Sequence, residues 1–129
     1  MTAVNWPHLV ILLALLQLLI FSFLVGWARG RYGVKAPATT GHEIFERYYR
    51  VQMNTIELLV MFIPALWIAA QHWSPARMAA IGAIYLIGRV IYLFAYTRNP
   101  ASRSLGFGLS LFPIIALWLA ALVGVVAPA

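Results

Sequence analysis

The sequence contains no cysteine and few charged residues. Without cysteine the chain has no disulfide, no thiolate ligand for a metal and no cysteine nucleophile, so any thiol in its chemistry must come from a substrate. Only 9% of its 129 residues are charged and 64% are hydrophobic, whereas soluble proteins are about 25% charged. A chain of this size cannot bury so much apolar surface in water, which indicates an integral membrane protein with a single domain, residues 1–129.

Four apolar runs are long enough to cross a hydrocarbon layer of about 30 Å as helices. They cover approximately residues 8–27, 44–70, 77–96 and 105–126. No positive residue precedes the first run, and this run is too long for the core of a signal peptide, so we expect a retained span. The short connections between the runs predict an all-α bundle whose four helices run alternately up and down.

Basic residues in the connections predict the orientation of the chain in the membrane. The first connection contains Arg29, Arg31 and Lys35, and the third contains Arg98 and Arg103. Two spans separate these connections, so both lie on one side, and positive residues collect on the cytoplasmic side. We therefore expect both connections in the cytoplasm and both termini on the opposite side, in a chain short enough to suit a bacterial inner membrane. This topology accounts for most of the net charge of +6 without nucleic-acid binding.

Two of the runs carry a polar stripe at the cytoplasmic end. At 100° per residue, three polar residues of the second run fall within about 60° of arc: Arg50, Asn54 and Glu57. Four residues of the third run share a face of similar width: Tyr85, Arg89, Tyr92 and Tyr96. Because neither stripe would be stable against lipid, we expect the two stripes to face each other.

Glu57 and Arg89 lie at similar depths in these stripes. Each is about 10 Å along the helix axis from the cytoplasmic end of its own stripe. We therefore predict that the two residues are close or share a ligand. One interpretation is a buried ion pair that only fixes helix packing, and the other is that both belong to a functional site.

Arginine and tyrosine are concentrated at the cytoplasmic ends of these runs. The cluster comprises Arg47, Arg50, Asn54, Tyr92, Tyr96 and Arg103. Guanidinium groups form paired hydrogen bonds with carboxylates, so the cluster indicates a bound anion. Snorkelling to the interface and the aromatic belt are alternative explanations for any one of these residues, but they explain the whole set less well.

Two motifs in this polar region are typical of a known family. The first extends from Thr39 to Asn54 and continues with Glu57 and Pro64. The second comprises Arg89, Tyr92, Tyr96 and Arg103. Together they resemble the MAPEG superfamily, the membrane-associated proteins in eicosanoid and glutathione metabolism. The resemblance covers approximately residues 28–104 and is greatest to the branch of leukotriene synthases and the second microsomal glutathione transferase.

The resemblance implies a homotrimer that holds glutathione between neighbouring subunits near the cytoplasmic surface. By matching position, it implies that seven residues contact glutathione: Arg29, Arg50, Gln52, Asn54, Glu57, Tyr92 and Tyr96. Arg103 would lie beside the sulfur as the catalytic residue and stabilise the thiolate. The expected function is a membrane glutathione transferase or glutathione peroxidase, whose thiolate attacks a lipophilic electrophile or a lipid hydroperoxide.

Two positions depart from the leukotriene-synthase branch. Leu58 stands where that branch has a tyrosine that contacts glutathione. Gly30 stands where it has a second arginine implicated in the lipid step. These departures leave glutathione binding as the expectation and weaken any expectation of leukotriene synthesis.

Other functions and ligands are also consistent with parts of the sequence. The superfamily resembled here includes a non-catalytic lipid-binding member, so a scaffold protein is the main alternative. An ion channel or transporter would use the buried charges as a pathway, although one short chain offers few helices for it. His8, His42 and His72 are scattered, so we expect no metal site. The expected partners are glutathione, its lipophilic co-substrate, membrane lipid and further copies of the chain.

Overall fold

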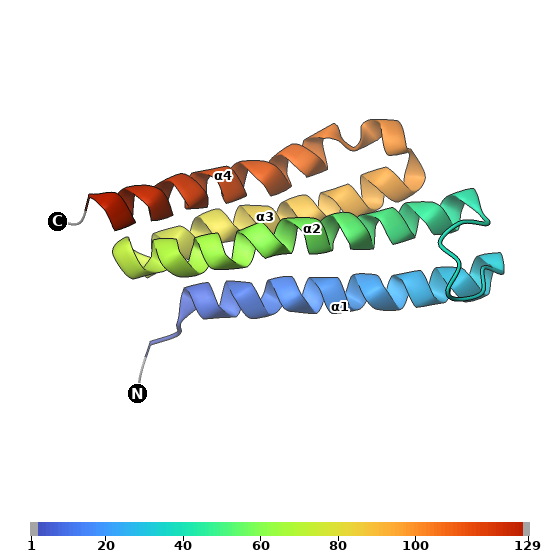
Figure 1. The fold of residues 1–129 in the computed structure, drawn as a ribbon, viewed down its shortest axis with the longest axis horizontal. Coiled ribbons are helices and arrows are strands. Elements are labelled where there is room, and N and C mark those ends of the chain that lie inside the picture. Colours follow the sequence, from blue (N-terminus) through green and yellow to red (C-terminus); the bar gives the residue numbers. More distant parts are fainter. Residues whose placement is uncertain (1–2, 128–129) are drawn as a thin grey trace.

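The computed structural model describes residues 3–127 as four helices that run alternately up and down (Figure 1). The elements are α1 (Trp6–Tyr32), α2 (Glu43–His72), α3 (Pro75–Arg98), the short 3-10 helix η1 (Pro100–Ser102) and α4 (Ser104–Val126). Each of the four long helices includes the corresponding predicted span, and the all-α, four-helix prediction is confirmed. α1 begins and α4 ends at one end of the bundle, and residues 33–42 and 99–103 form the other, which we call the loop end.

Local capping explains the bounds of α1 and corrects one prediction. The Asn5 side chain accepts a hydrogen bond from the His8 amide at 3.2 Å, which satisfies a free donor of the first turn. The helix ends because Gly33 adopts the left-handed conformation, with φ of 72°. Arg29 and Arg31 therefore lie in the last turn of α1 and not in a connection, as the sequence had suggested.

The pair α2 and α3 forms the centre of the bundle, with α1 and α4 on opposite sides of it (Figure 1). The backbones of α3 and α4 approach each other closely at two glycines. A Cβ on Gly88 would lie 2.7 Å from the backbone of Leu109, and a Cβ on Gly106 would lie 2.5 Å from the Tyr92 nitrogen. No side chain fits at these distances, so the two glycines set the spacing between α3 and α4.

Large apolar side chains cover the outside of all four helices. Phe23, Val60, Phe94 and Phe112 are each more than half exposed. All four helices are long and apolar enough to cross a membrane. Their outer faces therefore suit lipid, while the polar side chains described below lie mostly between helices.

The close contact at Gly106 predicts a specific loss of stability. We expect Gly106→Ala to lower the free energy of unfolding in detergent by about 1–3 kcal/mol, because the added methyl group must displace α4 from the Tyr92 backbone. Gly108→Ala is the matched control, since a Cβ on Gly108 meets no atom within 4 Å and alanine favours a helix. Thermal unfolding followed by circular dichroism compares the two, and equal midpoints would contradict the close contact.

Candidate functional site

A cleft of about 740 Å³ lies between α2, α3 and the start of α4, and it extends to Arg103 at the loop end. Six of the eight residues predicted from the sequence line it: Arg50, Asn54, Glu57, Tyr92, Tyr96 and Arg103. Leu58, Met61, Phe107 and Leu111 complete its lining. The cleft therefore combines charged and phenolic groups with an apolar wall, as a site for a polar ligand beside lipid requires.

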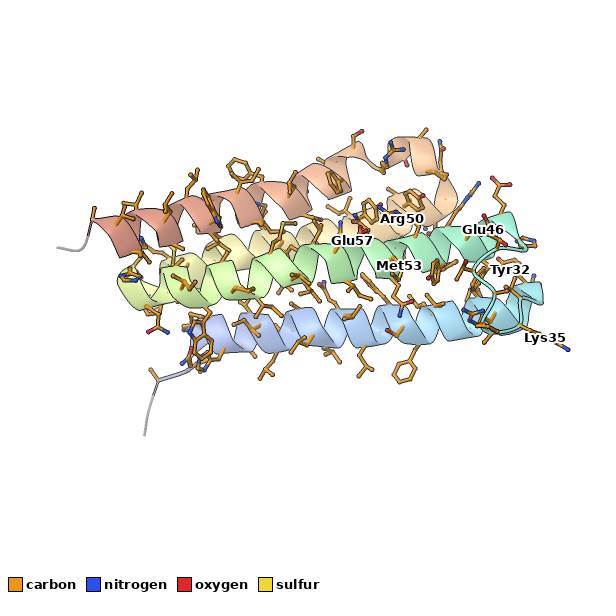
Figure 2. The ribbon with its side chains drawn as sticks, viewed as in Figure 1. Tyr32, Lys35, Glu46, Arg50, Met53 and Glu57 are labelled. Atoms are coloured by element: carbon orange, nitrogen blue, oxygen red, sulfur yellow. The ribbon has the colours of Figure 1, made fainter. Side chains whose placement is uncertain are left out.

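Arg50 and Glu57 form an ion pair on the face of α2 that lines the cleft (Figure 2). The distance between Arg50 Nη2 and Glu57 Oε1 is 3.3 Å, and the two side chains are 47% and 54% exposed. An ion pair this exposed adds little to stability. Both groups remain accessible to a ligand, to which they offer one cation and one anion.

The α3 wall of the cleft is aromatic and fixed by packing. The Tyr92 side chain is buried, and its ring stacks on that of Tyr96 with centroids 5.3 Å apart and planes 17° apart. The ring of Phe107 lies 6.3 Å from that of Tyr92 on the α4 side. Because the α4 backbone packs directly against Tyr92 at Gly106, this wall has little freedom to move.

Arg103 reaches the cleft from the connection between α3 and α4. This connection is ordered by Asn99, whose Oδ1 accepts a hydrogen bond from the Ala101 amide at 3.1 Å. Arg103 Nη1 donates to the Pro100 carbonyl at 3.3 Å and the side chain is exposed. Its guanidinium is therefore placed at the mouth of the cleft and lightly held, so that it can contact a ligand.

The predicted ion pair between Glu57 and Arg89 is not formed. Arg89 donates instead to three uncharged oxygens: Asn54 Oδ1 at 2.8 Å, Thr55 Oγ1 at 3.1 Å and Ser110 Oγ at 2.9 Å. Glu57 pairs with Arg50. The prediction compared depths along the helix axes, but the Arg89 side chain extends between α2 and α4 and is fully buried, whereas Glu57 faces the open cleft.

Two predicted glutathione contacts, Arg29 and Gln52, lie outside the cleft. Arg29 Nη1 donates to the Ala38 carbonyl at 2.7 Å, within the segment that connects α1 to α2. Gln52 Nε2 donates to Ser22 Oγ of α1 at 2.8 Å. Helical phase indicates this separation, because Gln52 is about 200° around the helix from Arg50.

The side chain of Arg47, in the first turns of α2, contacts the end of α3 and does not line the cleft, although the sequence placed it in the anion cluster. Its Nη1 donates to the carbonyls of Thr97 and Arg98, both at 3.1 Å, and its Nη2 donates to Glu43 Oε1 at 2.7 Å. The last carbonyls of a helix have no partner within the helix and carry partial negative charge. Arg47 therefore ties the start of α2 to the end of α3, from which the connection to Arg103 leaves.

Two of the three histidines have local structural contacts. The ring of His8 stacks on Trp67 with centroids 5.2 Å apart, and His42 Nδ1 accepts a hydrogen bond from the Ile44 amide at 3.1 Å at the start of α2. Within residues 3–127, no group of three or more histidine, aspartate or glutamate side chains is placed to hold a metal ion.

Comparison with known proteins identifies the family. A model of the MAPEG family matches residues 7–123. The chain belongs to the MAPEG family. It is 41% identical over 124 residues to an uncharacterized protein of Synechocystis, covering 96% of this chain and 90% of that one. It is 36% identical over 105 residues to human microsomal glutathione S-transferase 2 (81% and 71% covered), and 37% over 94 residues to leukotriene C4 synthase of Cavia porcellus (73% and 63% covered).

Membership of the MAPEG family, together with four apolar helices, makes this chain an integral multi-pass membrane protein related to glutathione enzymes. Leu58 lies in the lining of the cleft directly after Glu57. The departure noted in the sequence therefore replaces a potential hydrogen-bonding group of the cleft by an apolar one.

The contacts of Arg47 predict that it stabilises this MAPEG chain without taking part in the cleft. We expect Arg47→Met to lower the free energy of unfolding by about 1–3 kcal/mol, because two helix-end carbonyls lose a charged donor. Arg98→Met, at an exposed position of the same helix end, should change it by less than about 0.5 kcal/mol. Denaturation in detergent measures both, and similar values for the two variants would exclude this role.

Proposed function

We propose that this protein is a membrane-bound glutathione transferase. The observation that carries the proposal is the content of one cleft: the Arg50–Glu57 pair, the Asn54 amide, two stacked tyrosines and Arg103. Glutathione has two carboxylates, one ammonium group and one thiol, and the cleft offers a complementary group for one carboxylate, for the ammonium group and for the thiolate. The names of the relatives, microsomal glutathione S-transferase 2 and leukotriene C4 synthase, support the same substrate class.

Each polar group of the cleft has a role in this proposal. Arg50 binds a carboxylate through two parallel hydrogen bonds, and Glu57 binds the ammonium group. Tyr92 and Tyr96 offer hydroxyl groups along one side of the peptide. Arg103, at the mouth of the cleft, stabilises the thiolate by its positive charge.

The reaction begins when the bound thiol loses its proton to solvent. The thiolate sulfur then forms a bond to an electrophilic carbon, and the leaving group departs with its bonding electrons. A cation beside the sulfur lowers the pKa of the thiol, which is about 8.5 in a free cysteine, so that more of it is ionised at neutral pH. Arg103 is the catalytic residue in this scheme, because it contacts the reacting atom.

An apolar groove supports a lipophilic second substrate. A groove of about 700 Å³ runs between α2 and α4 and shares Met61 and Leu111 with the polar cleft. Its other lining residues are aliphatic or aromatic, including Ile115 and Trp118. An electrophile or lipid hydroperoxide dissolved in the bilayer could therefore approach the sulfur from the membrane side.

We further propose a homotrimer in which glutathione lies between subunits, with the loop end in the cytoplasm of a bacterial cell. Arg29 and Gln52 lie on the side of the chain formed with α1, whereas the cleft lies on the side formed with α3 and α4. Both sets can contact one ligand only if a second copy brings its α1 side to the cleft. Heterologous contacts of this kind form a closed trimer when successive copies are related by a rotation of one third of a turn.

Activity against a model aryl halide tests the catalytic role of Arg103. We expect Arg103→Ala to lower the rate at neutral pH by about tenfold to a hundredfold. The reason is that each unit by which the pKa of the thiol rises lowers the fraction of thiolate at neutral pH by about a factor of ten. The pH–rate profile should move to higher pH, because the thiol of the variant ionises only nearer its ordinary pKa. Arg98→Ala, outside the cleft, should behave as the native protein. Full activity of Arg103→Ala would show that the thiolate role is wrong.

Mixed subunits test the intersubunit site. Arg29→Ala and Glu57→Gln should each lower activity in a homo-oligomer. Random mixing of equal amounts of the two should restore about a quarter of the native sites. In one of the four possible neighbour combinations, a cleft with an intact Glu57 meets an intact Arg29 of the neighbouring subunit. A mixture no more active than either variant alone would place the whole site within one chain.

Calorimetry with millimolar glutathione separates an enzyme from a scaffold, since a scaffold of this family would give no binding heat.

A further inference from the structure

Arg89 is a buried cation that has no carboxylate partner among residues 3–127. Its side chain is 0% exposed. The chain has only three acidic residues, and all have other contacts: Glu43 with Arg47, Glu46 with the Gly41 amide and Glu57 with Arg50. An isolated charge within a membrane-spanning helix is costly and usually serves a function.

The hydroxyl groups around Arg89 are oriented to accept its hydrogen bonds. Thr55 Oγ1 donates its own proton to the Val51 carbonyl at 2.8 Å, and Ser110 Oγ donates to the Gly106 carbonyl at 2.7 Å. Their lone pairs are therefore free for the guanidinium, which they hold between α2 and α4.

Arg89 also determines which end of the Asn54 amide faces the cleft. Arg89 Nη1 donates to Asn54 Oδ1 at 2.8 Å, and because a guanidinium has no acceptor, only the amide oxygen can face it. The Asn54 Nδ2 group has no acceptor among residues 3–127, and Asn54 lines the cleft. A ligand in the cleft therefore meets N–H donors at this position and no acceptor.

The opposite wall of the cleft contacts Arg89 as well. The guanidinium carbon lies 4.4 Å from the centroid of the Tyr92 ring, whose other neighbour is Tyr96. A cation over an aromatic ring is attracted to its face, more strongly where water is excluded. One buried side chain thus contacts both the α2 wall and the α3 wall of the cleft without lining it.

We propose that Arg89 is a positioning residue that fixes Asn54 as a hydrogen-bond donor to an oxygen of the bound ligand. This inference rests on the proposed function, in which that oxygen is a carboxylate or peptide carbonyl of glutathione. Arg89 touches no ligand atom and acts through Asn54 and Tyr92.

The decisive variant is Asn54→Asp in the full-length protein in detergent. The carboxylate keeps the contact with Arg89 and turns it into an ion pair, so the thermal midpoint should be unchanged or higher. It also removes the N–H donors, so the Kd for glutathione measured by calorimetry should rise at least tenfold. If the contact between Arg89 and Asn54 served only packing, the Kd of Asn54→Asp for glutathione would equal that of the native protein. If the Asn54 amide directed its oxygen toward the ligand, the Kd of the variant would be unchanged or lower.

Two milder variants test whether Arg89 holds Asn54 in place. Thr55→Val and Ser110→Ala each remove one acceptor of Arg89 and neither residue lines the cleft. We expect each to raise KM for glutathione about threefold to tenfold while kcat at saturating glutathione changes little. Thr97→Val is the matched control, because Thr97 has the same bond to the preceding turn, at 2.7 Å to Leu93, but lies away from Arg89.

The outcomes separate the inference from the proposed function. If the native protein binds no glutathione, the proposed function fails and the role of Arg89 in it fails too. If the native protein binds and Asn54→Asp binds equally well, the orientation of Asn54 is wrong. If Asn54→Asp binds weakly but Thr55→Val and Ser110→Ala match Thr97→Val, Asn54 is a donor that Arg89 does not position.

Discussion

The charge of Arg89 has to be accommodated in a lipid-exposed bundle whose three carboxylates are all engaged elsewhere, and several features of the fold follow from this. Within residues 3–127 the hydrogen-bond acceptors of Arg89 are all neutral oxygens, and they come from the two helices α2 and α4. Gly88 lets the α4 backbone approach α3 closely enough for Ser110 to reach the guanidinium. The same close packing brings Gly106 against Tyr92 and so fixes the aromatic wall of the cleft.

The two sides of α2 serve different purposes. Arg50, Asn54 and Glu57 line the cleft with residues of α3 and α4, while Gln52 faces α1 and binds Ser22. Val51, which lies between these polar positions, is fully buried in the core. This division explains how a single motif of closely spaced polar residues can supply groups to two sides of one chain, and it is the geometric basis for proposing a site shared between subunits.

Much of the fold and part of the site could be predicted from the sequence for clear physical reasons. The spans followed from the length of apolar runs, and the grouping of Arg50, Asn54 and Glu57 followed from helical phase, since both are properties of one helix. The partner of Arg89 did not follow, because depth along two axes does not specify the direction of a side chain. The role of Arg47 also required the structure, since its acceptors are backbone carbonyls of α3 that no residue type reveals. The end of α1 depended on the conformation of Gly33 rather than on composition.

A structure of the purified protein determined at saturating glutathione tests the central claim most directly. The account predicts tripeptide-shaped density in the cleft, in contact with Arg50 and Glu57, with the sulfur beside Arg103. It also predicts that Arg29 of a second copy lies on the other side of the ligand. A cleft that contains only a lipid chain under these conditions, or glutathione bound elsewhere, would contradict it.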